Sequence, residues 1–579
     1  MSYLDAFPII MPVTKLILPS ASFDTESALA SFALCKQYFP KEKPRPYQAE
    51  IIGVLRDALT SPRFRYIFLQ LPVGDGKSVI ATTLAEYLVH EMKQSYYLLS
   101  PDLGLTAQYL RDFPFLREVK GRRNFFCAHH KFRNRTCDRA PCVTNPRFHC
   151  EASKICPYLI QRSRASGFPS VVSTPAYIDH AVGGEAFTTR SLSIRDEAHK
   201  LESFYLSFHS TSITQSDYED LFPGISYPLY DDPTFWKNEI DHIYSTLFTK
   251  LELAYEQQDH RTMERFYDLN EKVKSLQFLL REAKNVVVDV AQARHSGKYY
   301  TQFRPIKASA IAKPILDKVS EKTLFMSGTF LSINDRLDEL GIPPNEVLYI
   351  NKTVTSFPPE NRSIIYLPQG SMSFKRREKT LPKIIDTCLR IIQSHKDQRG
   401  VIICGSHQIR STIYNALTHL HNPDLLITHK SDDFSEAIDS FLSHQTLPQV
   451  FITTRFEGLD FHDRIAEFLI YVNLPYPPPM DKQIHSRLLL EQNTHLENVH
   501  SSCNPSIDEF GSCQKAVYCH NCRHWYDLQV ATAIQQSFGR IIRTPTDIGT
   551  IYILDNRFKK FFGENEDMFL SYNRSSIKL

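Results

Sequence analysis

The stretch LPVGDGKS brings together five residues that suit phosphate binding: Gly74, Asp75, Gly76, Lys77 and Ser78. Backbone N–H groups in such a loop can face phosphate oxygens, and a helix beginning after it adds the favourable charge of its N-terminus. Lys77 would then reach the β- and γ-phosphates, and the Ser78 hydroxyl would hold Mg²⁺. Asp75 is unusual beside phosphates, so its side chain must turn away from them. A glycine turn with a chance Gly-Lys-Ser is the other interpretation of this stretch.

Two adjacent carboxylates, Asp196 and Glu197, follow in the stretch SLSIRDEAHK. At the C-terminal end of a strand they would suit hydrolysis of a nucleoside triphosphate. Asp196 would hold Mg²⁺ through water, and Glu197 would orient and deprotonate the attacking water. Arg195 is unexpected just before them, because a central buried strand normally carries an apolar residue there. A charged loop is the other interpretation, and the phosphate loop upstream argues against it.

A third group lies near the C-terminus, where QQSFGRIIRT supplies Gln536, Arg540 and Arg543. If this stretch is helical, the three side chains lie on one face. Arginines directed at a γ-phosphate from a second domain stabilise the charge of the transition state. Taken alone, such a helix is more often a solvated surface, and the two upstream motifs favour the catalytic interpretation.

Five clustered cysteines form a separate group: Cys127, Cys137, Cys142, Cys150 and Cys156. The N-terminus has no signal-peptide pattern, and no apolar run approaches the ~18–20 residues that span a bilayer. We therefore expect a cytoplasmic protein, or a nuclear one in a eukaryote, where clustered thiols favour metal or cluster ligation over disulfides. Four thiolates hold an iron–sulfur cluster. A four-cysteine zinc site is the rival, although such sites usually contain a closely spaced pair that this segment lacks.

The same segment is basic and aromatic. From Arg117 to Arg135 the chain has seven Lys/Arg and one acidic residue, interleaved with Phe125, Phe126 and Phe132. Positive charge can follow a phosphate backbone, and aromatic faces can stack bases. The phenylalanines could equally form the small core of this segment.

Four further cysteines precede the C-terminal motif: Cys503, Cys513, Cys519 and Cys522. The last two have the C-x-x-C spacing of a structural zinc site. His500, His520 and His524 could replace a cysteine as ligands. Four unrelated free thiols are the other interpretation.

Strands and helices must position these motifs, and the sequence supplies them in two zones. Apolar runs alternate with amphipathic stretches, a pattern typical of doubly wound parallel sheets. The strands of the first zone are expected in RYIFLQLPVG, SYYLLSP, SVVSTPA, SLSIRDEAH and TLFMSGT. Those of the second zone are expected in RSIIYLP, GVIICGS, DLLITHK, QVFITTRF, EFLIYVNLP and GTIYILDNR. Two stretches interrupt the first zone: the cysteine segment, 121–165, and a mostly helical stretch, 201–305. Within the latter, the part from ELAYEQQ to VVVDVAQA has apolar residues at helical spacing.

The bulk properties agree with several folded domains. A chain of 579 residues is too long for one compact core. With 42% hydrophobic residues and a net charge of +3, neither disorder nor a global polyelectrolyte partner is indicated. Affinity for nucleic acid would have to come from local patches.

Taken in order, these stretches resemble the motifs of the XPD/DinG-type superfamily 2 iron–sulfur DNA helicases. RPYQ resembles the adenine-reading Q motif, LPVGDGKS motif I, SPDLGLTAQ motif Ia, DEAH motif II, MSGT motif III, GSH motif IV, TTRFEGLDF motif V and QSFGRIIR motif VI. SFPPENR resembles the opening of the second domain, and KGRRNFFC with CPYL resembles the frame of the iron–sulfur cluster. Arg195 and Lys200 depart from the family pattern around DEAH, and Asp75 departs from it in motif I.

The resemblance implies an α/β fold with two RecA-like parallel-sheet motor domains, an inserted iron–sulfur domain and a helical arch domain. The ATP-binding motor domain would comprise residues 1–120, 166–200 and 306–345. The iron–sulfur domain would be 121–165 and the arch 201–305. The second motor domain would be 346–579, with a cysteine-rich insertion at about 490–525.

The resemblance also implies roles for individual residues. ATP would be bound by Arg45, Gln48, Gly74, Asp75, Gly76, Lys77 and Ser78, with Mg²⁺ held by Ser78 and Asp196. The catalytic residues would be Asp196, Glu197, Gln536, Arg540 and Arg543. A [4Fe–4S] cluster would be held by Cys127, Cys142, Cys150 and Cys156, with Cys137 as an alternative ligand.

The implied activity is that of an ATP-dependent DNA helicase with 5′→3′ polarity, whose cluster domain lies where the strands separate. Its partners would be single-stranded and forked duplex DNA, without a membrane, and it would act as a monomer. DNA repair is one of several pathways that share these motifs. A DEAH-type RNA helicase and a nucleic-acid-binding scaffold with an inactive ATP site are the other interpretations.

Overall fold

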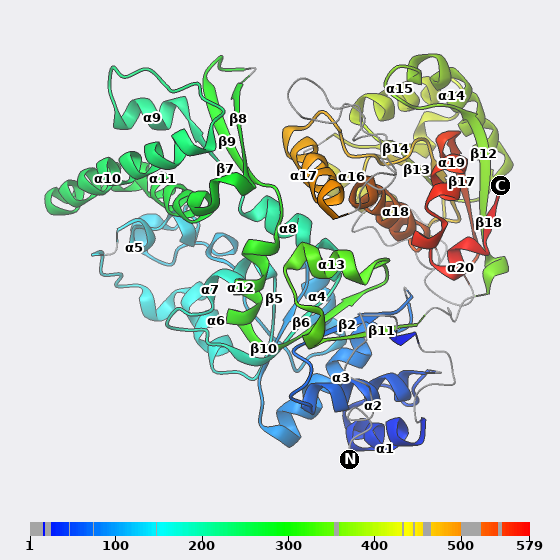
Figure 1. Cartoon of the computed structure of the whole chain (residues 1–579), viewed down its shortest axis with the longest axis horizontal. Helices are drawn as coiled ribbons and strands as arrows, with labels where there is room; N and C mark the ends of the chain where they lie inside the picture. The colour runs from blue at the N-terminus through cyan, green and yellow to red at the C-terminus, as the bar shows by residue number, and fades with distance from the viewer. Residues whose placement is uncertain are drawn as a thin grey trace.

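Two parallel β-sheets, each between layers of helices, dominate the computed structural model of the chain (Figure 1). It describes residues 16–17, 25–45, 47–72, 74–145, 147–293, 295–352, 358–430, 433–443, 446–455, 465–498, 523–541 and 547–579. The first sheet lies at the lower centre of Figure 1 and the second at the upper right. None of the helices in these ranges is both long and apolar enough to cross a membrane.

The first sheet has eight strands among the described residues, in the order β1-β11-β2-β10-β6-β3-β5-β4. Their bounds are β1 Leu16–Ile17, β2 Tyr66–Gln70, β3 Tyr96–Leu99, β4 Arg117–Glu118, β5 Ser170–Ser173, β6 Arg190–Arg195, β10 Ser320–Ser327 and β11 Val347–Asn351. Neighbouring strands are parallel, for example Phe325 beside Phe68 and Arg195. The two motifs that follow β2 and β6 therefore lie at the same edge of the sheet.

Both faces of this sheet are buried, as its almost uninterrupted apolar strands predict. Within β2, Tyr66 and Phe68 pack into one hydrophobic core, and Ile67 and Leu69 pack into another on the opposite face. The surrounding helices are α1 Thr25–Cys35, α2 Gln48–Thr60, α3 Lys77–Met92, α4 Leu103–Asp112, α6 Pro157–Ser166, α7 Pro175–Ala181, α8 Leu201–Phe208, α12 Ser309–Val319 and α13 Ile333–Leu340.

The second sheet has seven parallel strands in the part of the chain that the structure describes, in the order β14-β15-β13-β16-β17-β12-β18. Their bounds are β12 Arg362–Gly370, β13 Gly400–Ile403, β14 Leu426–Thr428, β15 Val450–Thr453, β16 Phe468–Tyr471, β17 Gly549–Asp555 and β18 Ile577–Lys578. Its helices are α14 Arg377–Ser394, α15 His407–Thr418, α16 Phe434–Ser443, α17 Lys482–Asn498, α18 His524–Phe538, α19 Arg557–Glu564 and α20 Ser571–Arg574.

The predicted α/β class with two RecA-like parallel sheets is confirmed. One detail differs from the expected division of the chain. Strand β11 pairs with β2 in the first sheet, so this sheet continues past residue 345, where the sequence interpretation ended the first motor domain. The short run VLYIN in β11 is apolar enough for a buried strand but carries no motif that would assign it to either sheet.

The insertion at 201–305 is only partly helical, and its end was predicted wrongly. Helices α9 Gln215–Leu221, α10 Pro233–Gln257 and α11 His260–Leu279 accompany an antiparallel sheet in the order β7-β9-β8, of which β7 precedes the helices and β8 and β9 follow them. Residues Val286–Gln292, expected to continue a helix, form β8 and pair with β9, Tyr299–Pro305; β7 is Thr211–Thr214. Consecutive β-branched valines favour a strand, and this preference outweighs the helical spacing of the apolar residues.

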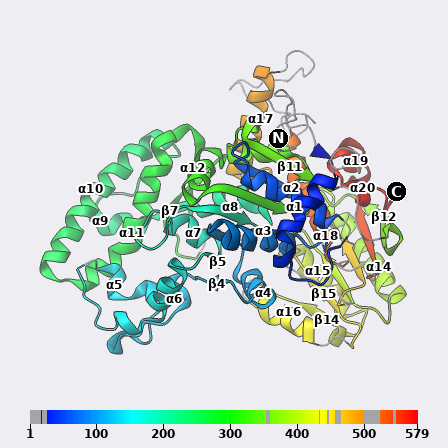
Figure 2. The ribbon, with the colours of Figure 1, turned by 90° about the horizontal axis from the view of Figure 1, so that it is seen from below.

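The cysteine segment lies beside this insertion, away from the second sheet (Figures 1 and 2). It is built from short turns and the four-residue helix α5, Pro141–Thr144. Three of its arginines pair with acids of α10 and α11: Arg135 with Glu264 (2.7 Å), Arg139 with Asp268 (2.7 Å) and Arg147 with Glu252 (3.4 Å). These contacts join the two insertions to each other.

Candidate nucleotide site and cysteine cluster

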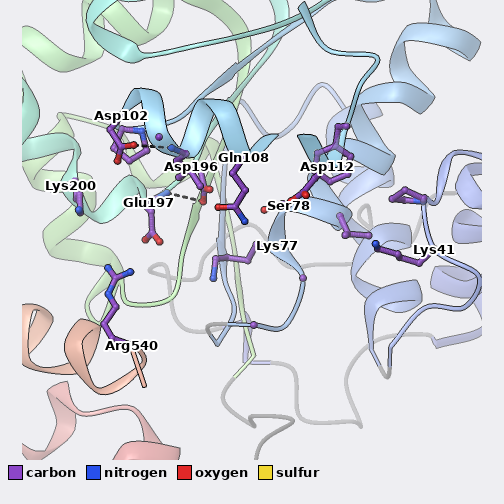
Figure 3. A pocket seen from close by; sticks show the side chains of 18 of the residues that line it. Lys41, Lys77, Ser78, Asp102, Gln108, Asp112, Asp196, Glu197, Lys200 and Arg540 are labelled. Atoms are coloured by element: carbon purple, nitrogen blue, oxygen red, sulfur yellow. Dashed lines mark hydrogen bonds between the residues drawn. The ribbon is translucent and has the colours of Figure 1, made fainter. Parts of the chain in front are cut away.

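A cavity of about 610 Å³ lies at the edge of the first sheet where β2, β3 and β6 end. The phosphate loop contributes Gly74, Gly76, Lys77 and Ser78, and the acidic motif contributes Asp196 and Glu197. One lining residue, Arg540, belongs to the second sheet's domain, and Figure 3 shows its side chain extending toward Glu197. The cavity therefore brings together residues from three sequence motifs that are far apart in the chain.

The phosphate loop is shaped by glycine and held by the preceding motif. Gly76 has φ 83° and is the residue before α3, and a Cβ there would lie 2.3 Å from the amide nitrogen of Gln48. That nitrogen donates to the carbonyl of Asp75 (3.1 Å), and the Arg45 guanidinium donates to the carbonyl of Gly74. Arg45 and Gln48, predicted to contact ATP, thus contact the loop itself; Arg45 also lines the cavity.

The side chain of Asp75 points away from the phosphate cavity. It is buried and forms an ion pair with Lys352, with Nζ 2.6 Å from Oδ2. Lys352 directly follows β11, at the end of the last strand of the first sheet, and its ammonium also lies over the Tyr47 ring. The ion pair with Lys352 explains how a carboxylate is tolerated in the phosphate loop. No motif in the sequence indicated Lys352 as this partner.

Asp196 is held in place from two sides. Its Oδ1 accepts a hydrogen bond from the backbone N–H of Glu197 (2.9 Å), and its Oδ2 accepts one from the Tyr109 hydroxyl (2.7 Å). Burial and the neighbouring charge of Glu197 raise the pKa of Asp196 to about 6, although Lys77 and Tyr109 oppose the rise. Tyr109 is a site residue that sequence analysis missed, because an isolated tyrosine on a helix gives no signal.

Glu197 is surrounded by positive charge. Burial alone would raise its pKa, but the cationic groups of His199, Lys77, Arg540 and Lys200 lower it to about 2. His199 Nδ1 lies 3.3 Å from the carboxylate and 2.9 Å from the hydroxyl of Ser327 at the end of β10. An ionised carboxylate at this position can accept a proton from water.

The unexpected Arg195 has a structural explanation. It is fully buried, and its guanidinium makes two hydrogen bonds to the carboxylate of Asp179 on α7, at 2.7 Å and 3.0 Å. The Tyr205 hydroxyl completes this group. A buried arginine is compatible with a central strand because a bidentate carboxylate partner neutralises it.

The C-terminal motif differs from the expected single helical face. Helix α18 ends at Phe538, and Gly539 follows it, so Arg540 lies on a turn beyond the helix. Gln536 does not line the cavity; its amide donates to the Thr329 hydroxyl and lies 3.5 Å from His199. Gln536 and Arg540 both reach the first domain, whereas Arg543 lies outside the described residues.

The thiols of the cysteine segment lie close enough to affect one another's ionisation. Burial, together with the neighbouring thiols of Cys156, Cys127 and Cys142, raises the pKa of Cys137 to about 12. Burial also raises the pKa of Cys142, and Cys150 contributes to this rise. Thiols that disfavour one another's ionisation in this way become stable as thiolates when a positively charged centre binds between them.

The chemistry of this donor set fits an iron–sulfur cluster, because four thiolates hold such a cluster and this segment has five cysteines. Among the described residues, no group of three or more His, Cys, Asp or Glu side chains is arranged around a point where one metal ion could bind.

The second cysteine group, Cys503, Cys513, Cys519 and Cys522, lies outside the described residues, as do His500 and His520. His524, considered as a substitute ligand, is described at the start of α18. Its Nε2 lies 2.9 Å from Asp335 on α13. The structure therefore gives His524 a carboxylate partner in the first domain.

Two known protein families match parts of the chain. Residues 41–216 match the family described as type III restriction enzyme, res subunit, and residues 388–573 match the helicase C-terminal domain. The first match contains the phosphate loop and the acidic motif, and the second contains Gln536 and Arg540.

Curated relatives match over shorter stretches. The chain is 38% identical over 104 residues to a regulator of telomere elongation helicase 1 homolog from Drosophila ananassae, covering 18% of this chain. It is 30% identical over 134 residues to regulator of telomere elongation helicase 1 from Rattus norvegicus, covering 22% of this chain. Each match spans only 9% of the length of the relative.

Solved structures match over nearly the whole chain. An XPD helicase superposes with a TM-score of 0.57 at 15% identity, covering 91% of this chain and 99% of that one. The structure of S. tokodaii Xpd4 gives 0.53 at 14% identity, covering 92% and 100%. The cavity is lined by residues of both domains. The fold is therefore that of a two-domain RecA-like protein. In its family matches, its relatives and its fold, the chain is similar to helicases of the XPD/DinG type.

Proposed function

We propose that the protein is an ATP-dependent DNA helicase. The observation that carries this proposal is the composition of the 610 Å³ cavity, where Lys77, Asp196 and Glu197 of one RecA-like domain meet Arg540 of the other. A nucleotide bound there would touch both domains, so its hydrolysis would change how they fit together. The match to a helicase C-terminal domain supports a nucleic-acid strand as the object that this motion moves.

The residues of the cavity supply the parts that phosphoryl transfer to water requires. Lys77 and the loop N–H groups would neutralise the phosphates, and Ser78 and Asp196 would hold Mg²⁺, which screens the charge on the β- and γ-phosphates. Glu197, kept ionised by its cationic neighbours, would orient the attacking water and accept its proton. Arg540 would stabilise the charge on the transferring group, and Arg543 remains a proposed second contributor.

The contacts between the domains support a route from hydrolysis to motion. Glu197 contacts His199, which lies near both Ser327 of β10 and Gln536 of α18. Gln536 also bonds to Thr329, two residues beyond β10. A change in the charge near Glu197 would therefore act directly on a hydrogen-bonded contact between the two domains.

We further propose a [4Fe–4S] cluster in the cysteine segment. Its ligands would be Cys127, Cys142, Cys150 and Cys156, with Cys137 as the alternative to one of them. When bound, the cluster would supply a rigid centre to a segment that is built from short turns. The basic and aromatic residues around it would then present a fixed surface to the DNA where the strands separate.

ATPase assays with no nucleic acid, single-stranded DNA or RNA test the proposed activity. We expect stimulation by DNA, together with unwinding of a fork that carries a 5′ single-stranded tail but not one that carries only a 3′ tail. Lys77→Ala should reduce hydrolysis by about 100-fold or more, whereas the surface variant Lys36→Ala should match the wild type. Stimulation by RNA alone would favour an RNA helicase, and absence of hydrolysis would favour a binding scaffold.

Anaerobic purification with iron analysis and an absorption spectrum tests the cluster. We expect about four irons per chain and a broad visible absorption band. Cys156→Ser should lose both. A comparison of Cys137→Ser with Cys142→Ser identifies the remaining ligand, because only one of these two variants should retain full iron content. Colourless, iron-free wild-type protein would contradict the proposal, and stoichiometric zinc would favour a zinc site.

A further inference from the structure

A buried tyrosine lies behind Asp196, one of the two residues that would hold the divalent cation. Tyr109 is on α4, the helix that follows β3, and is only 2% exposed. Its hydroxyl donates to Oδ2 of Asp196 at 2.7 Å. One phenol thus joins α4 to the acidic motif.

This contact fixes the orientation of the Asp196 carboxylate. Its other oxygen, Oδ1, already accepts a hydrogen bond from the backbone N–H of Glu197. With Tyr109 the carboxylate is therefore restrained at both oxygens.

Tyr109 is not in contact with the cavity itself. The cavity is lined on this helix by Gly104, Leu105, Gln108 and Asp112, and Tyr109 is not among its lining residues. Its hydroxyl can therefore act on a bound nucleotide only through Asp196. In this respect Tyr109 differs from a catalytic residue, which would itself touch the nucleotide.

We propose that Tyr109 is a positioning residue that holds the Asp196 carboxylate in the orientation that binds the divalent cation of the nucleotide. The proposal rests on the proposed ATPase function. Cation binding benefits when its ligands are already oriented, because their rotational freedom is not lost on binding. Removing the phenol oxygen should weaken binding of the cation without removing any group that touches the nucleotide.

The test compares the affinity of a non-hydrolysable ATP analogue with and without Mg²⁺, by calorimetry on the full chain. In the wild type, Mg²⁺ should tighten binding. In Tyr109→Phe this gain should shrink by about tenfold or more, while the metal-free affinity stays unchanged. Mn²⁺ binding in the presence of the analogue, followed by electron paramagnetic resonance, should weaken in parallel. A general structural defect would lower the metal-free affinity as well.

A matched control is available in Tyr97, a buried tyrosine of β3 whose hydroxyl donates to the carbonyl of Thr188. Tyr97→Phe removes the same atom from the same domain and should leave the Mg²⁺ gain at the wild-type value. If Tyr109→Phe does not fold, Tyr109→His, which carries a shorter ring donor, should still show a reduced gain.

The outcomes separate this inference from the proposed function. If the wild type binds the analogue with a Mg²⁺ gain and the Tyr109 variants show the same gain, the role of Tyr109 is wrong while the ATPase proposal stands. If the wild type binds no nucleotide, the ATPase proposal fails first. An equal loss in Tyr97→Phe would also overturn the assignment, because the effect would then be structural.

Discussion

At the scale of single residues, the cavity depends on charges that come from opposite domains. Glu197 is ionised because four cationic groups outweigh its burial, and one of these, Arg540, comes from the domain of the second sheet. The electrostatics of the proposed general base therefore require both domains to be close together.

Arg540→Ala should lower kcat for ATP hydrolysis by about 10³- to 10⁵-fold, the range found where an arginine directed at the γ-phosphate is removed. The affinity for the ATP analogue should change much less, because the loop and Lys77 belong to the other domain. Steady-state kinetics with analogue binding measures both. The exposed Arg574→Ala variant, also in the second domain, serves as control, and an unchanged kcat in Arg540→Ala would exclude the proposed role.

The buried pair Asp75–Lys352 makes a second prediction at this scale. Asp75→Asn would leave the buried Lys352 ammonium without its carboxylate, and breaking such a pair from one side costs about 3–5 kcal/mol of unfolding free energy. The double variant Asp75→Asn/Lys352→Met should recover part of that loss. Denaturant unfolding of the first domain measures it, and additive effects of the two substitutions would show that the pair is not coupled.

At the scale of elements, the ion pairs between the cysteine segment and helices α10 and α11 are exposed. Their side chains are 41–56% accessible, and such pairs contribute only about 0.2–1 kcal/mol each. Salt shortens the range of their attraction from ~10 Å at 0.1 M to ~3 Å at 1 M. The contact between the two insertions is thus weak and sensitive to ionic strength.

Hydrogen exchange of residues 137–145 should therefore become faster at high salt. Asp268→Arg should have the same effect at low salt, because it places like charges opposite each other. The exchanged pair Arg139→Asp/Asp268→Arg should restore slow exchange. Salt-independent exchange, or no recovery in the exchanged pair, would mean that apolar packing rather than charge holds the contact.

The elements also illustrate what sequence could predict. Strands β2, β6 and β10 were predictable because each is an apolar run that ends at a chemical motif, and parallel strand ends meet at one edge. The helical spacing of apolar residues predicted a helix through β8, although its consecutive valines favour a strand. The motif from Gln536 to Arg543 was likewise expected to be helical, although Gly539 ends α18. The partners of Asp75, Asp196 and Arg195 could not be predicted, since Lys352, Tyr109 and Asp179 are brought near only by the register of distant strands.

At the scale of the whole molecule, a network of charged and polar side chains joins the two domains. It consists of Glu202 of α8, Arg336 and Glu339 of α13, Arg487 and Glu491 of α17, and Trp525, Gln529 and Thr532 of α18. Glu339 is 2% exposed. Burial and the adjacent Glu202 raise the pKa of Glu339 well above its usual value, although Arg336 opposes this rise.

This network predicts that stability depends on pH. Because the folded protein holds a proton on Glu339 that the unfolded chain releases near pH 4.5, stability falls as pH rises above that value. In thermal unfolding at about pH 5 to 9, Glu339→Gln should gain stability relative to the wild type as pH increases. The surface variant Glu321→Gln should follow the wild-type curve. Parallel curves for wild type and Glu339→Gln would contradict the prediction.

The strand order of the first sheet has a consequence for how the protein is made. Strand β10 joins β2 to β6, and β11 covers the other side of β2, yet both come after the cysteine segment and the helical insertion. In a nascent chain leaving the ribosome, both edges of β2 and the edge of β6 that faces β10 therefore stay unpaired until residues 320–351 emerge. The two insertions are synthesised first, and the nucleotide-binding domain is completed only afterwards.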